Sequence, residues 1–311
     1  MRQAYVLPFH AAIRAACHGA GRRVWKHVMI LGSHLSTSGG LHKALESAGD
    51  YGFPAVALFL RSPRQWVAPP LEPEDIRTFR AARKRVGTEV IVAHASYLIN
   101  LAGDSPARDK GIAAVTEDLE RCAALGIEFL VLHPGSCPDL AEGIDRIAAG
   151  LDEAMESVAR KRVKLLLEST AGQGNCIGHR FEHLAELLSR VRRPSRYGLC
   201  LDTAHLFAAG YDLRTPADWR TTMQAFDHIV GFKHLCVMHV NDSKKPLASR
   251  VDRHEHIGLG EIGPDAFGHL VNDERFIDIP LILETPKGTR DEDGRDWDEI
   301  NAEVLHELCR R

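Results

Sequence analysis

The sequence predicts an α/β fold, a (β/α)8 TIM barrel whose active site lies at the carboxyl-terminal rim of its strands. Eight short apolar runs rich in Val, Ile, Leu or Phe recur along the chain. Segments with helical spacing of apolar residues separate them, and the repeated units fill residues 28–311 without an obvious linker. Strand alternating with helix indicates repeated βαβ units, and eight such units can close into one barrel.

The predicted strands come first. They are Val28–Leu31, Ala55–Leu60, Val90–Ala93, Phe129–Leu132, Val163–Leu167, Tyr197–Leu201, Leu235–Met238 and Pro280–Leu283. Such nearly continuous apolar runs are typical of parallel strands buried on both faces. Helical spacing is clearest at Glu74–Val86, Ala107–Leu125, Ile144–Arg160 and Phe181–Val191. A doubly wound open sheet is the structural alternative, but no GxGxxG motif follows the first run.

Composition limits the class of protein. Hydrophobic residues make up 44% of the chain and charged residues 26%, as in a soluble globular protein with a substantial core. No apolar stretch reaches the roughly 18 residues that a membrane helix needs, so we expect no membrane partner. The seven cysteines show no CxxC spacing, which favours a reducing compartment. We therefore expect a cytoplasmic protein, most simply in a bacterial cytosol.

Residues 1–27 form a basic N-terminal extension that we place outside the barrel. They contain five basic residues and no acidic one, so residues 28–311 carry a formal charge of −8. Arg14 interrupts the only apolar run of this extension, which makes it a poor secretory signal, and organelle import is a minor alternative. The acidic remainder argues against coating of nucleic acid by bulk positive charge. Binding of DNA would have to depend on local basic loops or bound cations.

Metal-ligating residue types follow seven of the eight apolar runs. They are His34, His94, His133, Glu168, Asp202, His239 and Glu284. In a parallel barrel these positions emerge on one rim, where the active sites of such barrels lie. A single polar residue at a loop start is ordinarily a solvated residue or a cap. Only roughly one residue in five is His, Asp or Glu, so the full set is improbable by chance, and donors without thiolates favour a catalytic zinc site.

Three further donors follow the same rim. His205 comes three residues after Asp202, and Asp252 and His254 lie in the long segment after the seventh run. In an extended segment, residues i and i+2 project to the same side and can chelate one ion, although Asp-Arg-His alone would more simply be a solvated loop. His34 is kept as a residue near the site, which leaves nine donors, enough for three divalent cations. Such a cluster can bind a phosphate and activate water for in-line displacement.

Several segments at these positions resemble the endonuclease IV family of zinc-dependent abasic-site (AP) endonucleases, also called AP endonuclease family 2. The segments are GSHLSTSGGL at 32–41, RQW at 64–66, HASYLINL at 94–101, LHPGS at 132–136, LESTAGQG at 167–174, LDTAHLFAAGYDLRT at 201–215, MHVNDSK at 238–244, SRVDRHEHIG at 249–258 and LILET at 281–285. The resemblance covers residues 29–285. The motifs at 201–215 and 249–258 are the most specific.

The resemblance implies a ligand set and an activity. His94 and His133 would bind one zinc ion, Glu168 would bridge to a second held by Asp202, His239 and Glu284, and His205, Asp252 and His254 would hold a third. Glu168 is therefore the expected catalytic residue. The implied enzyme is a deoxyribonuclease IV (phage-T4-induced type) that hydrolyses the phosphodiester bond 5′ to an abasic site in duplex DNA. It would leave 3′-hydroxyl and 5′-deoxyribose phosphate ends.

The resemblance also implies contacts to DNA. Family members bend the duplex and flip the abasic nucleotide out, and the residues matching that role are Arg64 and Tyr97, with Gln65 beside them in the loop after the second strand. The remaining basic loop residues are expected phosphate contacts, although a solvated run of charges explains them equally well. They are Arg61, Lys244, Lys245, Arg250 and Arg253. An open rim that accepts a long duplex favours a monomer.

This chain departs from the family pattern at a few places. Cys137 follows HPGS where His is expected, and Ala204 stands in the DTxH motif where Cys is common. Neither belongs to the ligand set. Ser62-Pro63 and residues 246–248 lie in loops that touch DNA in relatives, so these differences bear on the range of lesions and on affinity.

Two other functions remain open from the sequence. A sugar isomerase or epimerase of the xylose isomerase-like barrels would share the fold and a divalent metal site. It would not need a third metal held by a DxxH and a DxH motif. A metal-binding or DNA-binding module without turnover is the other alternative, but binding alone would need fewer than nine donors.

Overall fold

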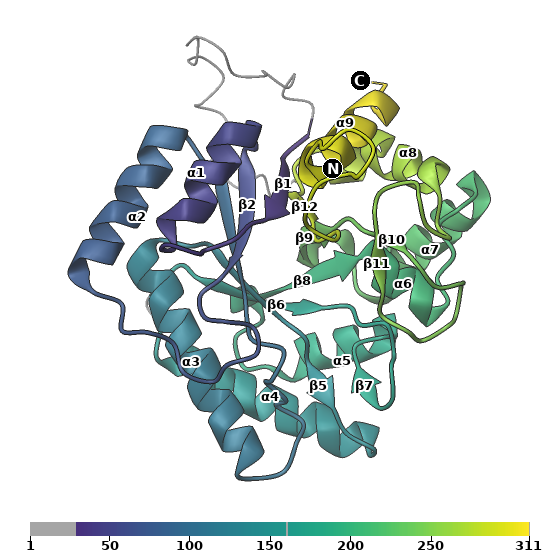
Figure 1. The fold of residues 1–311 in the computed structure, drawn as a ribbon. Coiled ribbons are helices and arrows are strands. Elements are labelled where there is room, and N and C mark those ends of the chain that lie inside the picture. The colour runs from purple at the N-terminus through teal and green to yellow at the C-terminus, as the bar shows by residue number, and fades with distance from the viewer. Residues whose placement is uncertain (1–28, 160, 311) are drawn as a thin grey trace, which may run out of the picture.

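Eight parallel strands close into a barrel, which confirms the predicted fold class (Figure 1). The computed structural model describes residues 29–159 and 161–310, so the N-terminal extension and residue 160 lie outside the described residues. The barrel strands are β1 (Leu31–His34), β2 (Ala55–Phe59), β3 (Val90–His94), β4 (Phe129–Leu132), β6 (Lys164–Glu168), β8 (Tyr197–Asp202), β9 (Leu235–His239) and β12 (Leu281–Leu283). They pair in chain order, and β1 pairs with both β2 and β12 to close the ring.

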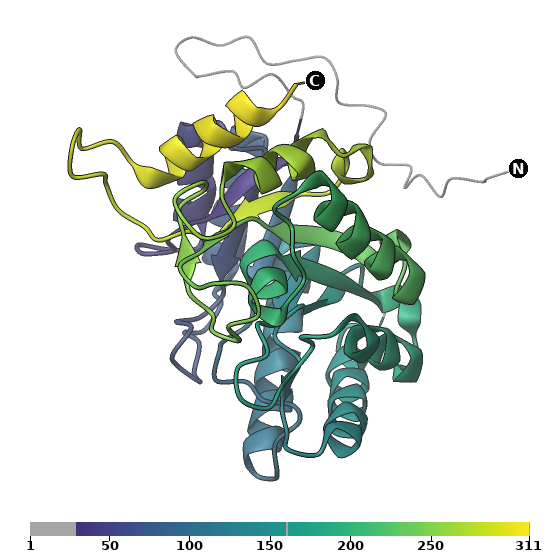
Figure 2. The same cartoon turned by 90° about the vertical axis from the view of Figure 1, so that its right-hand side faces the viewer.

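Helices cover the outside of the barrel (Figures 1 and 2). They are α1 (His42–Tyr51), α2 (Pro73–Val86), α3 (Ala107–Leu125), α4 (Leu140–Glu156), α5 (Phe181–Arg190), α6 (Thr203–Ala209), α7 (Pro216–Ile229), α8 (Pro264–Asn272) and α9 (Trp297–Leu308), with short 3-10 turns η1 (Pro194–Arg196), η2 (Phe232–His234) and η3 (Glu274–Phe276). Among the described residues, no helix has both the length and the apolar character required to cross a lipid bilayer.

The apolar core has two parts because each strand is buried on both faces. One cluster lies inside the barrel and consists of Ala55, Ala57, Val92, Val131, Leu166, Cys200, Val237 and Ile282. The other, much larger cluster takes the alternate strand residues and packs them against the helices. This double burial is the physical reason for the nearly continuous apolar runs that predicted the strands.

The first strand lies three residues later than predicted. β1 begins at Leu31 and ends at His34, and Val28 lies outside the described residues. A side-chain Cβ at Gly32 would stand 2.3 Å from the carbonyl oxygen of Ala55, so only glycine allows this close pairing with β2. The hydroxyl of Ser33 donates to the carbonyl of Leu283 on β12. Glycine and serine thus occupy strand positions that an apolar-run criterion passes over.

Helix boundaries follow local capping. α3 has its predicted bounds and α2 and α5 differ from theirs by one residue, but α4 begins at Leu140 and ends at Glu156 instead of spanning Ile144–Arg160. The side chain of Asp139 accepts a hydrogen bond from the backbone N–H of Glu142 and starts α4 four residues earlier.

Two small antiparallel sheets lie in the loops that follow barrel strands. One pairs β5 (Gly135–Ser136) with β7 (Cys176–Ile177), and the other pairs β10 (Asp242–Ser243) with β11 (His254–Glu255). The first joins the loops after β4 and β6. The second folds the long segment after β9 back on itself. Both sheets therefore shape the carboxyl-terminal rim of the barrel.

Candidate metal centre and substrate surface

The predicted donors converge because most of them are the last residues of neighbouring strands. His34, His94, Glu168, Asp202 and His239 end β1, β3, β6, β8 and β9, while His133 and Glu284 immediately follow β4 and β12. The register pairs Asp202 directly with His239. The barrel ladder itself therefore fixes where these side chains begin, and the side chains of Glu168, Asp202 and His239 are completely buried.

Glu168 is the centre of the arrangement, and its two carboxylate oxygens face different groups of histidines. Oε2 lies 3.0 Å from Nε2 of His94 and 3.1 Å from Nε2 of His133. Oε1 lies 2.9 Å from Nδ1 of His239 and 3.4 Å from Nδ1 of His205. A carboxylate with a separate set of nitrogen donors at each oxygen is suited to join two metal ions.

A second group forms on the Oε1 side. Ligand atoms of Glu168, Asp202, His239 and Glu284 all lie within 4.8 Å of one another. Nδ1 of His239 is 3.0 Å from Oε2 of Glu284, and Nδ1 of His34 is 2.9 Å from the other oxygen of Glu284. His34 thus contacts the group through Glu284, as expected for a residue near the site.

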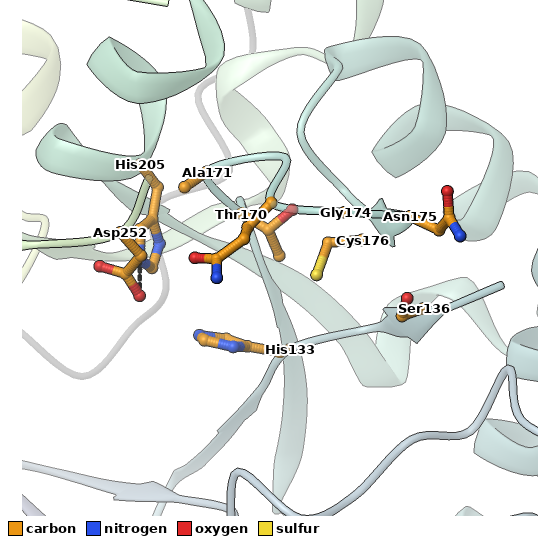
Figure 3. Close-up of a pocket in the computed structure, with 10 residues that line it drawn as sticks. His133, Ser136, Thr170, Ala171, Gly174, Asn175, Cys176, His205 and Asp252 are labelled. Carbon is orange, nitrogen blue, oxygen red and sulfur yellow. Dashed lines mark ion pairs between the residues drawn. The ribbon is translucent and has the colours of Figure 1, made fainter. Parts of the chain in front are cut away.

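The third predicted group forms around Asp252, which bridges two histidines. Its carboxylate oxygens lie 3.1 Å from Nε2 of His205 and 3.2 Å from Nε2 of His254. Figure 3 shows the ion pair between Asp252 and His205. Asp202 also belongs here, because its ligand atom lies within 4.8 Å of those of His205 and His254. Asp202 therefore borders two groups, although the sequence assigned it to only one.

The histidine rings are oriented as metal-binding rings usually are. Nδ1 of His94, His205 and His254 lies within 3.1 Å of the backbone carbonyls of Ala95, Ser169 and Glu284, respectively. If Nδ1 donates to the carbonyl, the lone pair of the neutral ring is on Nε2, which is the usual arrangement around a protein-bound metal. Nε2 of His205 and Nε2 of His254 are buried and face the carboxylate of Asp252 without making a hydrogen bond of ordinary geometry. Buried ring nitrogens that face carboxylates in this way fit a bound cation, so the chemistry of the donor set matches a metal centre.

The buried carboxylates and histidines stabilise one another's charged forms. Burial disfavours the charged form of Glu168, yet His239 and His133 outweigh it and hold the pKa of this carboxyl well below its usual range. Burial likewise opposes protonation of His254, but Asp202 and Asp252 raise its pKa to about 9. The clustered carboxylates are thus stabilised by nearby positive charge, either on protonated histidines or on metal ions.

The loop that carries Asp252 and His254 is held by the buried carboxylate of Asp242. Its two oxygens accept backbone N–H groups from Ser243, Gly258, Gly260, Ile262 and Gly263. A Cβ at Gly260 would stand 2.5 Å from Oδ1 of Asp242, so glycine is needed for this approach. Asp242 thereby fixes the fold of the segment between β10 and α8, which contributes Asp252 and His254 to the third group.

A pocket of about 380 Å³ opens beside the cluster (Figure 3). His133, His205 and Asp252 form one side of it. Its other lining residues come from the loops after β4 and β6 and are Ser136, Thr170, Ala171, Gln173, Gly174, Asn175 and Cys176. Hydroxyl and amide groups next to the predicted ligands suit a polar, uncharged substrate part such as a sugar.

The predicted DNA-contacting residues lie around this mouth. Tyr97 is 55% exposed, and its ring centroid lies 5.3 Å from that of His94 and 5.8 Å from that of His133. Arg64 and Gln65 are exposed on the loop after β2. Tyr97 is thus placed beside the cluster, with its ring available to a substrate.

Arg61 was expected among the phosphate contacts, and that expectation is wrong. The residue is only 4% exposed, and its guanidinium donates to the carboxylate of Asp118 and to the carbonyls of Trp66 and Ala114. A side chain that ends in this internal network cannot reach a phosphate. Its role is to connect the loop that carries Arg64 to helix α3.

The other expected phosphate contacts are exposed on the segment between β9 and α8. They are Lys244, Lys245, Arg250 and Arg253. The backbone N–H of Arg250 donates to the carbonyl of Ala208, so this segment packs against the end of α6. These basic side chains share the segment with Asp252 and His254.

Two residues that contact the cluster were not selected from the sequence. Cys200 lies inside the barrel, and its Sγ is within 4.8 Å of ligand atoms of Glu168 and His239. Burial raises the pKa of the Cys200 thiol to about 12. Asn241 donates to Asp202 and accepts from the backbone N–H of Glu284. In the sequence, the only indication that these two residues contact the cluster is that each lies two residues from a predicted ligand, Asp202 or His239.

Comparison with known proteins agrees with this geometry. A family model described as a xylose isomerase-like TIM barrel matches residues 45–307. The probable endonuclease 4 of Chloroflexus aurantiacus strain J-10-fl is 45% identical over 280 residues, which cover 89% of this chain and 97% of that protein. The probable endonuclease 4 of Geobacter sulfurreducens is 42% identical over 284 residues, covering 90% and 95%.

Solved structures give the same result. The crystal structure of endonuclease IV from Thermus thermophilus superposes with a TM-score of 0.80 and 37% identity, covering 89% of this chain and 98% of that one. A D-tagatose 3-epimerase-like protein superposes with a TM-score of 0.68 at 22% identity, covering 90% and 97%, which shows a shared fold alone.

The closed barrel and its mouth of histidines and carboxylates therefore define a xylose isomerase-like TIM barrel. Within this class, the identity to relatives over nearly their whole length shows that the chain belongs to the endonuclease IV family.

Proposed function

We propose that this protein is a DNA repair endonuclease that hydrolyses the phosphodiester bond 5′ to abasic sites in duplex DNA. The products would be a 3′-hydroxyl and a 5′-deoxyribose phosphate end. Family membership supports endonuclease activity, since relatives that are 40–45% identical bear the name probable endonuclease 4. The observation that carries the proposal is the position of Glu168, whose two oxygens each face a separate pair of histidines.

The proposed cofactor is a set of three zinc ions. His94, His133 and Glu168 would hold the first, Glu168, Asp202, His239 and Glu284 the second, and His205, Asp252 and His254 the third. Nitrogen and oxygen donors of this kind suit zinc at a catalytic site. When bound, the ions would supply the charge that activates water and stabilises negative charge on the phosphate oxygens.

Residues of the chain would perform the remaining steps. Glu168 would hold the first two groups at a fixed separation, because its carboxylate is fully buried and cannot rotate freely. Asn241 and the helix-capping contact from His205 would orient the carboxylate of Asp202. The four acidic ligands carry −4 and three divalent ions +6, so the mouth would attract a phosphate although residues 28–311 are acidic.

Recognition of the lesion would come from the loops around the mouth. Tyr97, Arg64 and Gln65 would occupy the space left in the duplex when the abasic nucleotide is extruded. Lys244, Arg250 and Arg253 would contact phosphates of the same duplex. The pocket beside His133, which hydroxyl and amide side chains help to line, would accept the deoxyribose of the extruded nucleotide. A monomer acting in the bacterial cytosol is the simplest assembly that leaves this rim open.

The test is a duplex oligonucleotide that contains one tetrahydrofuran abasic analogue. We expect a single nick immediately 5′ to the analogue, together with close to three zinc ions per chain by elemental analysis. Absence of nicking by fully metallated protein would refute the proposal. One or two manganese or cobalt ions with activity on a ketose sugar would instead favour an isomerase or epimerase.

A further inference from the structure

A basic surface lies at the amino-terminal end of the barrel strands, opposite the proposed catalytic rim. Three segments that lead into β6, β8 and β9 contain no Asp or Glu and are residues 157–164, 190–196 and 230–236. We define the basic end surface as Lys161, Arg162, Lys164, Arg192, Arg193, Arg196 and Lys233. All of them except Lys164 and Arg196 are exposed.

Contacts between the segments show that the surface is continuous. The guanidinium of Arg196 donates to the backbone carbonyls of Val158, Ala159 and Val163, which ties the second segment to the first. The ammonium of Lys164 lies 3.9 Å from Sγ of Cys236, which ties the first segment to the third. Strands β6, β8 and β9 are consecutive neighbours in the barrel. The seven residues therefore form one surface.

Internal carboxylates neutralise only part of this charge. Arg192 contacts the carboxylates of Asp152 and Glu156, and Arg193 lies 3.5 Å from Glu156. Within the described part of the chain, no ion pair involves Lys161, Arg162 or Lys233. Ion pairs join this surface to two carboxylates, and a third carboxylate, that of Asp227, accepts the backbone N–H of Phe232 beside Lys233. The positive groups still outnumber the carboxylates, although residues 28–311 are acidic overall. Clustered positive charges create a local positive potential, which favours an anionic partner.

We propose that the basic end surface binds the phosphate backbone of a second duplex segment while the opposite rim holds the lesion. This inference rests on the proposed function, because it assumes that the rim is occupied by DNA. A group of exposed basic residues suits a regularly spaced polyanion. A membrane-binding surface would add exposed apolar side chains. The exposed large apolar residues of the described chain are Val67, Tyr97, Leu98, Leu140, Leu259 and Ile277, all outside the three segments.

The experiment uses the zinc-loaded full chain and two duplexes. A bead-bound duplex carries a tetrahydrofuran analogue with a hydrolysis-resistant phosphorothioate linkage on its 5′ side, and it is loaded with one protein per lesion. A fluorescent duplex without a lesion is then added and its capture is measured against salt concentration. We expect capture that depends on the protein and weakens steeply as salt rises.

The test variant combines Lys161→Glu, Arg162→Glu and Lys233→Glu. The matched control makes the same change in charge at exposed residues elsewhere, with Lys84→Glu, Arg220→Glu and Arg310→Glu. The test variant should capture the second duplex at least about 10-fold less well and lose about 2.7 from the salt slope, since each phosphate contact contributes about 0.9. The control should resemble the parent.

Several outcomes would overturn the inference. These are no capture by the parent protein, an equal loss in the control variant, and binding to phosphatidylglycerol vesicles instead of to the second duplex. Incision of a short cleavable abasic duplex is measured in parallel, and all variants should incise it like the parent. If the parent fails to incise, the proposed function fails. If it incises but captures nothing, only the basic end surface is refuted.

Discussion

Arg61 and Asp118 form a buried ion pair in which Nη2 of the guanidinium lies 2.7 Å from Oδ1 of the carboxylate. The pair joins the loop after β2 to helix α3, because Arg61 also donates to the carbonyl of Trp66 in that loop. Arg121 of α3 donates to the carbonyl of Pro69 further along the same loop. Hydrogen bonds to α3 therefore fix the position of the segment that presents Arg64 and Gln65.

Comparing the single and the double replacement of this pair should distinguish its effect on the position of the loop from its effect on the stability of the fold. Arg61→Leu alone leaves Asp118 buried without its partner and should destabilise the protein by about 3 kcal/mol. Adding Asp118→Leu should recover most of that stability, but the Trp66 carbonyl would still lack the hydrogen bond from Arg61. We expect the double variant to have a raised KM for abasic duplex, about 10-fold, with unchanged zinc content and nearly unchanged kcat. Urea unfolding and steady-state kinetics would check this, and an unchanged KM would contradict it.

Glu168→Gln should abolish incision. An amide has one oxygen instead of two and no charge, so it cannot serve both groups of histidines. We expect the rate to fall by at least about 100-fold, since even changes behind the ligands cost 10- to 100-fold. Elemental analysis should show loss of zinc as well. Glu153→Gln on the exposed face of α4 is the matched control, and equal rates for the two variants would remove Glu168 from its proposed role.

Asp242→Asn should weaken the third group selectively. The amide nitrogen would face backbone N–H groups that the carboxylate now accepts, at a cost of about 1–3 kcal/mol. The segment carrying Asp252 and His254 would loosen, whereas the strand-end donors would keep their positions. We expect zinc content to fall from about three to about two per chain, with the tightly held ions retained after brief chelator treatment. Retention of all three ions would show that the segment does not need Asp242.

Stability should decrease below neutral pH through His183. Burial, followed by His179 and Arg180, lowers the pKa of His183 to about 4, and its Nδ1 accepts the backbone N–H of Gly178. Because the folded pKa lies below the unfolded value near 6.5, this contribution is complete above pH 6.5 and is lost as the pH falls toward 4.

The matched variant is His183→Asn, which can still accept the Gly178 N–H but does not titrate in this range. Between pH 7 and pH 5, the parent should lose about 1 kcal/mol of unfolding free energy relative to the variant, after discounting for solvent screening. Urea unfolding at several pH values measures the difference. Parallel pH profiles would show that His183 is not the titrating group.

The strand-end part of the site could be predicted because the barrel architecture determines it. Parallel strands of similar length end on one rim, so His94, Glu168 and His239 had to meet once the strands were recognised. The position of β1 was less predictable. Gly32 and Ser33 are not apolar, and only the close approach of Ala55 and the hydrogen bond to β12 explain why they belong to a strand.

Long-range partners set the rest of the site, and local patterns do not reveal them. Arg61 follows a strand on the predicted rim and was expected to be exposed, but Asp118, which buries it, lies 57 residues away on α3. Asp252 and His254 reach the cluster because Asp242 gathers backbone N–H groups up to Gly263. Neither relationship leaves a periodic signal in the sequence.

The closing pair of strands, β1 and β12, has a consequence for synthesis of the protein. Glu284 follows the last strand, and β1 stays unpaired along one edge until residues 281–283 have been made. A chain released before that point lacks both the closing strand and one member of the second metal group. An unfinished copy would therefore have neither a closed barrel nor a complete second metal group, and the proposed incision requires both.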